Sequence, residues 1–176
     1  MLLVAAKRAT ERLLQASSLR EVIVRPAAFQ EVWLGPATGL RPDKRRAVIY
    51  GRGRTPIPYV AEDDVAEACV RLATMGQPPE SVDFGGPEAL TRHQVVDAFE
   101  RAVGARFRRI VVPSPALVLG ARALRRSRPE LASILGLALS MDQDSFPGTE
   151  PLQVLDVQPQ PASAYIAAQV RQAART

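Results

Sequence analysis

Segments with the apolar spacing of amphipathic helices alternate along the chain with short apolar runs that are typical of strands. Segment 5–17 has an apolar side, and its Lys7 and Glu11 are spaced to form an i,i+4 ion pair, so we expect a helix there. Residues 22–24 follow as a β-branched run, which is typical of a strand buried on both faces in a parallel sheet. We expect Pro26 to end this strand, because proline cannot continue a hydrogen-bonded ladder.

Strands and helices continue to alternate towards the end of the chain. Further strands are expected at residues 47–50, 57–60, 82–84 and 107–112, with a loop at 35–46. Further helices are expected at residues 28–34, 65–75, 91–103, 115–126 and 129–141, and from residue 162 to the end. Thr91 and Gln94 form a capping box at the start of the helix at 91–103, and Gly104 ends that helix.

This order of elements predicts an α/β fold with one unusual feature. A helix leads directly into the strand at 22–24, yet no earlier strand in the sequence is there to pair with it. A strand buried on both faces needs neighbouring strands on both sides and helices above and below. We therefore expect the chain to be the latter part of a larger α/β unit.

The composition narrows the available chemistry. Cys69 and His93 are the only residues of their kinds, which excludes a disulfide framework and a Cys/His zinc site, and we expect no metal site. We expect Cys69 to be buried on the helix at 65–75 and His93 to face solvent. The pair Asp63-Asp64 fits a helix N-cap better than two carboxylates that share a proton.

The formal charge is +5, from 23 basic and 18 acidic residues, and Lys7 and Lys44 are the only lysines. Arginine clusters are typical both of phosphate-binding surfaces and of solvated faces. The clusters do not fall on one helix, and no helix-turn-helix or zinc pattern accompanies them, which disfavours nucleic-acid binding. No apolar run reaches about 18 residues and no signal peptide is recognisable, so we expect a cytoplasmic protein without a membrane span.

The usual phosphate-binding glycine motifs are absent from the sequence. A dinucleotide loop needs Gly-x-Gly-x-x-Gly between a strand and a helix, so that backbone N–H groups and the helix N-terminus surround the pyrophosphate. Gly51-Arg52-Gly53 is the only Gly-x-Gly, and Pro56 stands where the third glycine would be. We interpret this segment as a turn.

Five groups of residues occur in a characteristic order. They are Lys7-x-x-x-Glu11, Leu13-Leu14-Gln15-Ala16-Ser17, Val22-Ile23-Val24-Arg25-Pro26 with Phe29 and Trp33, Tyr59-Val60-Ala61-Glu62-Asp63-Asp64-Val65-Ala66, and Phe84-Gly85-Gly86-Pro87-Glu88-Ala89-Leu90-Thr91. In order and spacing they resemble the later half of atypical short-chain dehydrogenase/reductases of the NmrA-like, NAD(P)-binding type.

This resemblance implies the latter part of a doubly wound Rossmann-like sheet at residues 1–90 and a small, mainly helical substrate-side subdomain at residues 91–176. The nucleotide-binding half, with its glycine-rich loop, would lie upstream and comprise on the order of 100 residues. The implied cofactor is NAD or NADP. We expect this chain alone to bind it weakly or not at all.

The resemblance also implies site residues. Lys7 would face the cofactor, and the segment Pro26-Ala27-Ala28-Phe29 would line the nicotinamide pocket, with Phe29 and Trp33 as walls on the substrate side. From the residues alone, a surface ion pair for Lys7 and a core role for the two aromatic residues remain open. The Tyr-x-x-x-Lys pair of ordinary members is absent, because Leu3 stands four residues before Lys7, and whether the chain is an enzyme stays open.

Three functions are therefore considered. The first is an NAD(P)-binding oxidoreductase or redox sensor of NmrA-like type that acts on a small molecule. The alternative is a non-enzymatic interaction module, which would dock through an exposed sheet edge onto a second copy or onto a chain that supplies the missing half. Nucleic-acid binding is the third.

Overall fold

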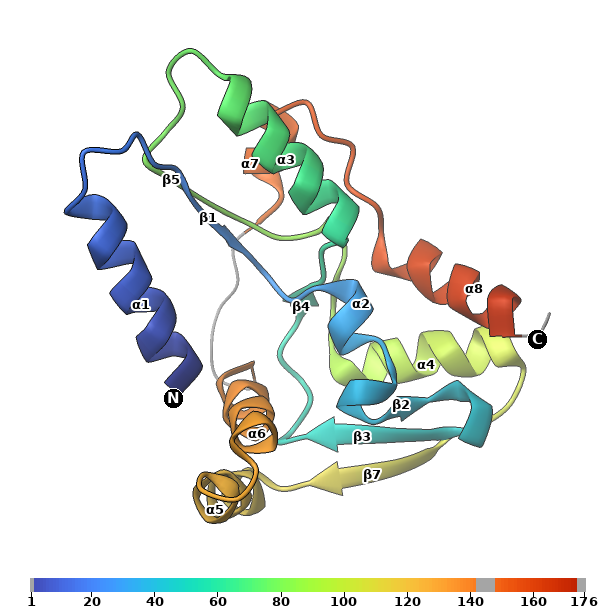
Figure 1. Cartoon of the computed structure of the whole chain (residues 1–176). Coiled ribbons are helices and arrows are strands. Elements are labelled where there is room, and N and C mark those ends of the chain that lie inside the picture. The colour runs from blue at the N-terminus through green and yellow to red at the C-terminus, as the bar shows by residue number, and fades with distance from the viewer. Residues whose placement is uncertain (1, 142–147, 174–176) are drawn as a thin grey trace.

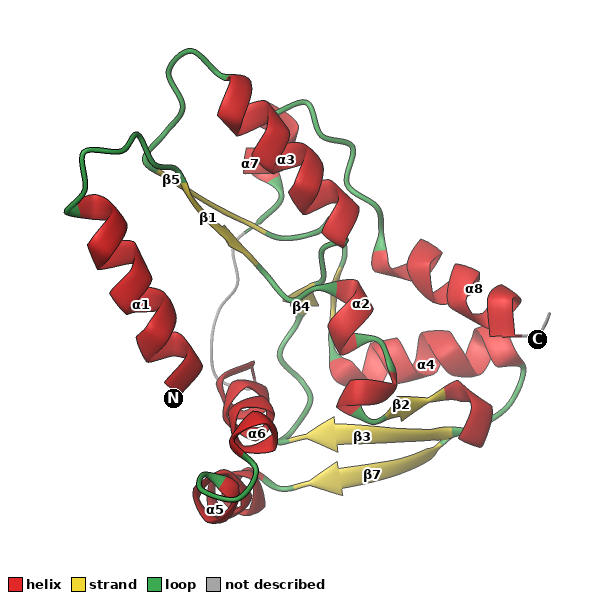
Figure 2. Cartoon of the chain, in the orientation of Figure 1, coloured by secondary structure: helices red, strands yellow, loops and turns green. Residues whose placement is uncertain are grey.

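The computed structural model describes residues 2–141 and 148–173. Its helices and strands are coloured along the chain in Figure 1 and by type in Figure 2. The helices are α1 (Leu2–Gln15), α2 (Gln30–Trp33), α3 (Glu62–Thr74), α4 (Arg92–Val103), α5 (Ser114–Leu124), α6 (Pro129–Met141), α7 (Glu150–Val154) and α8 (Ala162–Ala173), with 3-10 turns η1 (Pro36–Thr38) and η2 (Pro42–Lys44). The strands are β1 (Ile23–Pro26), β2 (Leu40–Arg41), β3 (Arg46–Tyr50), β4 (Ile57–Pro58), β5 (Ser81–Phe84), β6 (Ala89–Leu90) and β7 (Arg108–Val112).

β1 and β5 form a parallel pair, with Val24 opposite Val82 and Arg25 opposite Asp83. The two valines lie on the face that packs against α3 and α7. Arg25 and Asp83 are exposed on the other face, where Arg25 also binds Glu11 of α1. Ile23, on the same face as Arg25, is 8% exposed, so the prediction of a strand buried on both faces is confirmed at the start of β1 and fails at Arg25, where the second face carries ion pairs.

A second sheet has the order β2-β3-β7, with β3 antiparallel to β2 and parallel to β7. α4 packs between this sheet and α8, and its buried side chains recur at helical spacing (Figure 1). The predicted capping box of α4 is confirmed: Gln94 N donates to the Thr91 hydroxyl at 3.2 Å, and the Gln94 side chain accepts from Thr91 N at 2.8 Å. Gly104 ends the helix with a φ of 71°, a conformation that favours glycine.

Two clusters of buried side chains hold these elements together. The larger cluster packs α4 and α8 against the β2-β3-β7 sheet and includes Trp33, Leu40, Tyr59, Val95, Val96, Phe99 and Ile166. The smaller cluster packs α3 and α7 against the β1–β5 pair and consists of Val60, Ala68, Leu72, Val82, Phe84, Leu152, Leu155 and Val157. Tyr59 and Val60 are adjacent in the chain and belong to different clusters, so the backbone between them links the two packing regions.

Most predicted elements are confirmed with shifted ends. α3 begins at Glu62 rather than at residue 65, and the predicted helix at 28–34 contains only the four residues of α2. The predicted loop at 35–46 contains β2 and two 3-10 turns, and β6 and α7 were not predicted at all. Each of these missed elements has five residues or fewer, which is too short to show a hydrophobic period. Among the described residues, no helix has the length and apolar character needed to cross a membrane.

Candidate functional site

The carboxyl ends of β1 and β5 lie at the same edge of their sheet, because the two strands are parallel. The chain leaves β1 through Ala27, whose N–H donates to the Phe84 carbonyl at 2.8 Å. The next residue, Ala28, accepts a hydrogen bond from Val60 N at 3.0 Å, and Gln30 N donates to the Val60 carbonyl at 2.9 Å. This second parallel contact places the end of β1 directly beside the segment that carries Tyr59.

The loop after β5 reaches the same segment through Gly86. Its N–H donates to the Pro58 carbonyl at 3.0 Å. A Cβ on Gly86 would lie 1.8 Å from the Tyr59 carbonyl oxygen, so only glycine permits this approach. The loops that follow β1 and β5 thus both pack against residues 58–60 and hold Tyr59 in position.

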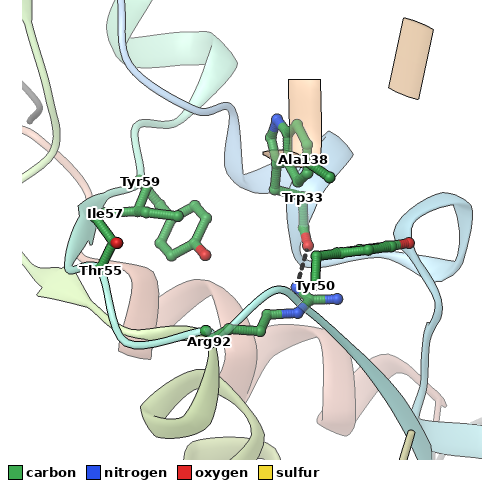
Figure 3. Close-up of a pocket in the computed structure, with 8 residues that line it drawn as sticks. Trp33, Tyr50, Thr55, Ile57, Tyr59, Arg92 and Ala138 are labelled. Atoms are coloured by element: carbon green, nitrogen blue, oxygen red, sulfur yellow. Dashed lines mark hydrogen bonds between the residues drawn. The ribbon is translucent and has the colours of Figure 1, made fainter. Parts of the chain in front are cut away.

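A small cavity lies next to the side chain of Tyr59, which forms part of its wall. Its lining comes from segments that are distant in sequence and consists of Trp33, Tyr50, Gly53, Thr55, Ile57, Tyr59, Arg92 and Ala138. The volume open to the centres of water-sized atoms is about 30 Å³, which accommodates about two water molecules. Figure 3 shows Tyr59 and Trp33 on opposite sides of this space, with the Arg92 guanidinium below them.

Arg92 is the charged group of this cavity, and its side chain is almost completely buried, with 6% exposed. Its guanidinium donates to three carbonyl oxygens, those of Trp33 at 2.7 Å, Thr38 at 2.9 Å and Val48 at 3.1 Å. These bonds join α4 to α2, to η1 and to β3. Within the part of the chain that the structure describes, no carboxylate pairs with this guanidinium, and burial lowers the pKa of Arg92.

The two tyrosines of the cavity differ in their surroundings. Burial raises the pKa of the fully enclosed Tyr59, and the nearby Arg92 guanidinium opposes this shift. Burial also raises the pKa of Tyr50, which is half-buried and donates its hydroxyl to the Thr38 carbonyl at 3.1 Å. Both phenols are therefore neutral hydrogen-bonding groups at neutral pH. They supply an aromatic wall and a polar hydroxyl next to a fixed positive charge.

No protein-family model and no curated protein matches the sequence. Solved structures do match the fold. An isoflavone reductase superposes on 94% of this chain and 57% of its own length, with a TM-score of 0.74 and 20% identity. An NADPH-dependent quinone oxidoreductase from Escherichia coli, complexed with NADPH, superposes on 91% of this chain and 57% of its own, with a TM-score of 0.70 and 17% identity.

A leucoanthocyanidin reductase from Vitis vinifera, in a binary complex with NADPH, superposes on 93% of this chain and 59% of its own length, with a TM-score of 0.70 and 15% identity. The chain is similar in fold to the matched part of these Rossmann-like reductases, two of which are complexes with NADPH. It spans somewhat more than half the length of these three solved structures. At these identities the likeness concerns the reductase fold, and the activities named for the three proteins remain theirs.

Within this reductase fold the predicted site residues are only partly brought together. Trp33 lines the cavity, whereas Phe29 is half-buried against the smaller cluster and pairs with Val60. Ala28 is buried in the larger cluster. Lys7 is exposed on α1, and the predicted ion pair with Glu11 is replaced, because both carboxylate oxygens of Glu11 accept from Arg25, at 2.9 and 3.1 Å.

Two further predictions for single positions are wrong, those for Cys69 and for the pair Asp63-Asp64. Cys69 is exposed, because the buried face of α3 consists of Asp64, Ala68 and Leu72, and Cys69 lies just beside that face. His93 is partly exposed, which agrees in part with the prediction that it faces solvent, and its Nε2 lies 3.1 Å from the Arg52 carbonyl, which can only accept a hydrogen bond.

The predicted N-cap role of Asp63-Asp64 is also wrong, because the cap of α3 is Ala61. Asp64 is instead buried, and its Oδ2 accepts from Gln160 N at 2.9 Å. Burial raises the pKa of this carboxyl. Asp64 therefore ties α3 to the segment that leads into α8. Among the described residues, no group of three or more His, Cys, Asp or Glu side chains is placed to hold a metal ion.

The sequence analysis missed Arg92, Tyr50 and Tyr59 as site residues. The signal for Arg92 was available, since it shares one face of its helix with Val95, Val96 and Phe99 at the spacing i, i+3, i+4 and i+7. A charged residue on an apolar helix face is either paired or functional. No sequence period indicated the two tyrosines, because they occupy β3 and the turn after β4.

Proposed function

We propose that the chain forms the substrate side of an NAD(P)-dependent oxidoreductase, or of a redox sensor, of the NmrA-like, atypical short-chain dehydrogenase/reductase type. The observation that carries this proposal is the parallel pair β1–β5, whose carboxyl ends pack against the Tyr59 segment at the aromatic cavity. Ligands of open α/β sheets bind at this edge. When bound, the nicotinamide would supply or accept the hydride, and the cavity would take the polar end of a small-molecule substrate.

The cofactor-facing residues in this proposal are Lys7 and the segment Pro26-Ala27-Ala28-Phe29. The N–H groups of Ala28 and Phe29 donate to no residue that the structure describes, and they lie just beyond the carboxyl end of β1. Such backbone groups suit the carboxamide or ribose oxygens of a nicotinamide nucleotide. Lys7 is exposed on α1, where a cationic donor is available for ribose hydroxyls. NAD and NADP fit this role equally, because the selecting groups belong to the adenosine side.

We further propose that the free edge of β1 pairs with a parallel strand from a nucleotide-binding half, carried on the same or another polypeptide. Among the described strands, β1 pairs with β5 alone. α1 precedes β1 as the helix of a βαβ unit does, and a right-handed crossover would place the preceding strand along the unpaired edge. The part of the solved reductases that this chain does not match would supply such a strand.

Saturation-transfer NMR with NADP⁺ tests the proposed cofactor side on the 176-residue chain itself. We expect weak transfer to the nicotinamide protons and none to the adenine protons, since the proposed contacts involve the nicotinamide end alone. The substitution Lys7→Met should reduce this transfer. Lys44→Met is the matched control, because Lys44 is the other lysine of the chain and lies in η2, outside the proposed site.

Two results would contradict the proposal. Transfer that is absent, or that falls equally in both lysine variants, would remove the nicotinamide site from this region. Transfer to the adenine protons together with low-micromolar binding of NADPH would show that the chain holds the whole dinucleotide, which the proposal assigns to another half.

A further inference from the structure

No acidic side chain among the described residues balances the charge of the buried Arg92 guanidinium. Buried charged groups in proteins are normally paired with an opposite charge, because removing them from water is costly. The three carbonyl oxygens around Arg92 satisfy three of the five N–H donors of a guanidinium, yet they carry only partial negative charge. No carboxylate of a described residue supplies the balance. An anion that enters the cavity would balance the positive charge of Arg92.

The cavity itself fits a small anionic group attached to a flat apolar one. Its room for about two water-sized atoms matches the two oxygens of a carboxylate rather than a whole ligand. The side chains of Trp33 and Tyr59 flank this space, with Ile57 and Ala138 alongside (Figure 3). Aromatic and aliphatic walls of this kind favour a conjugated or aromatic body next to the charged group.

We propose that this cavity binds the carboxylate, or an equivalent oxyanion, of a small aromatic or conjugated acid, with Arg92 as its charge partner and the Tyr59 hydroxyl as a further hydrogen-bond donor. The carbonyls of Trp33, Thr38 and Val48 hold the guanidinium in one orientation, so the site is organised before the ligand arrives. The inference rests on the proposed function, since it names the substrate class of the same cavity. A planar guanidinium is suited to a carboxylate because it offers two parallel N–H donors.

The test uses the fluorescence of Trp33, the only tryptophan of the chain, which lines this cavity. Sodium benzoate is the probe, and benzamide is the neutral probe of the same shape. We expect benzoate to change the fluorescence saturably and benzamide to bind roughly 10- to 100-fold more weakly, since a hydrogen bond to a charged group contributes roughly 1.5–3 kcal/mol. Equal binding of the two probes would overturn the proposal, as would no saturable response to benzoate.

Variants separate a binding role of Arg92 from a purely structural one. Arg92→Lys keeps the charge and removes the planar fork, and Arg101→Lys makes the same change at an exposed position of α4. We expect Arg92→Lys to bind benzoate about tenfold more weakly than the unmodified chain does, and Arg101→Lys to keep the affinity of the unmodified chain. Equal affinities of the two variants would contradict the assignment.

Tyr59→Phe provides a second readout that does not depend on the stability of the Arg92 variant. The change deletes one hydroxyl and leaves the ring in the cavity, so the fold should persist while benzoate binding weakens by about fivefold. Unchanged affinity would remove Tyr59 from the site. Because no dinucleotide is present in these titrations, benzoate binding without any nicotinamide contact would contradict the proposed function alone, and nicotinamide contact without benzoate binding would contradict this inference alone.

Discussion

Arg25 and Arg92 show how differently the two packing regions of this chain use a charged residue. Arg25 lies on the β1–β5 pair, has 42% of its side chain exposed and binds two carboxylates, those of Glu11 and Asp83. Arg92 lies in the larger cluster, is 6% exposed and binds backbone carbonyls instead of carboxylates. Ion pairs at the surface contribute little to stability, whereas a buried guanidinium determines which groups can surround it. The charge expected to matter more for the structure is therefore that of Arg92, for which no described residue supplies an acidic partner.

Exchanging each arginine for methionine tests this contrast and should have the largest effect. Arg92→Met removes three hydrogen bonds from a charged donor and should lower the free energy of unfolding by about 2 kcal/mol or more, because each such bond contributes roughly 1.5–3 kcal/mol. The Trp33 and Thr38 carbonyls keep a second donor, the hydroxyls of Thr38 and Tyr50, which limits the loss. Arg25→Met should cost several times less, and that small cost should fade at high ionic strength. Urea unfolding at low and high salt measures both. Equal losses in the two variants would abolish the distinction between the regions.

The link between the two regions can be weakened at Gly86. A Cβ at this position would overlap the Tyr59 carbonyl oxygen, so the loop after β5 must move away from residues 58–60. We expect Gly86→Ala to cost about 1–3 kcal/mol, the usual range for overpacking. Gly76→Ala is the control, since nothing lies within 4 Å of a Cβ there. Thermal unfolding of both variants decides the point, and a similar melting temperature for the two would contradict the close approach.

Two buried acids should give the regions opposite pH dependences. Burial raises the pKa of Asp64 above its ordinary value of 3.8, so the folded protein holds that proton more tightly than the unfolded chain, and stability is lost as the pH rises through this interval. The pKa of Glu100 is lowered below 4.5, first by the N–H of Phe107 at 2.8 Å and then by Arg109, so its contribution is present above that pH and lost below it.

The substitutions Asp64→Asn and Glu100→Gln make these slopes measurable. We consider the free energy of unfolding of each variant minus that of the unmodified chain. This difference should increase for Asp64→Asn, and decrease for Glu100→Gln, as the pH rises from about 3 to 7, a pH range set roughly by the ordinary carboxyl pKa values. Chemical unfolding at several pH values gives both differences. Slopes of the same sign would show that the two carboxyl groups experience similar surroundings.

The smallest expected effect concerns Cys69, which lies on the exposed side of α3 directly after the buried Ala68. Because the thiol is exposed, it should react with a thiol reagent in the folded protein nearly as fast as in denaturant. Cys69→Ser should leave the stability unchanged within about 0.5 kcal/mol, as is usual for surface substitutions. A thiol that reacts only after unfolding would place Cys69 on the buried face.

Local signals determined much of the fold in advance. The capping box at Thr91 and Gln94, the glycine that ends α4, and the helix at Pro129–Met141 were all predicted, because each depends on residues a few positions apart. The α/β class also followed from the sequence, since β-branched runs between helices favour parallel strands. The motif order pointed to the NAD(P)-binding reductase fold that the solved structures share.

Only the tertiary structure decided which polar residues are enclosed. Arg92 and Asp64 lie on buried helix faces, while Cys69 is exposed, and hydrophobicity ranks all three the other way. Their positions depend on partners 44 to 96 residues distant, such as the Val48 carbonyl for Arg92 and Gln160 N for Asp64. The period along α4 places Arg92 on the apolar face of the helix, but it contains no information about which distant groups surround the guanidinium there. The cavity is likewise assembled from segments that meet only in the folded chain, so the side chains that surround Arg92 and form the aromatic walls could not be derived from spacing alone.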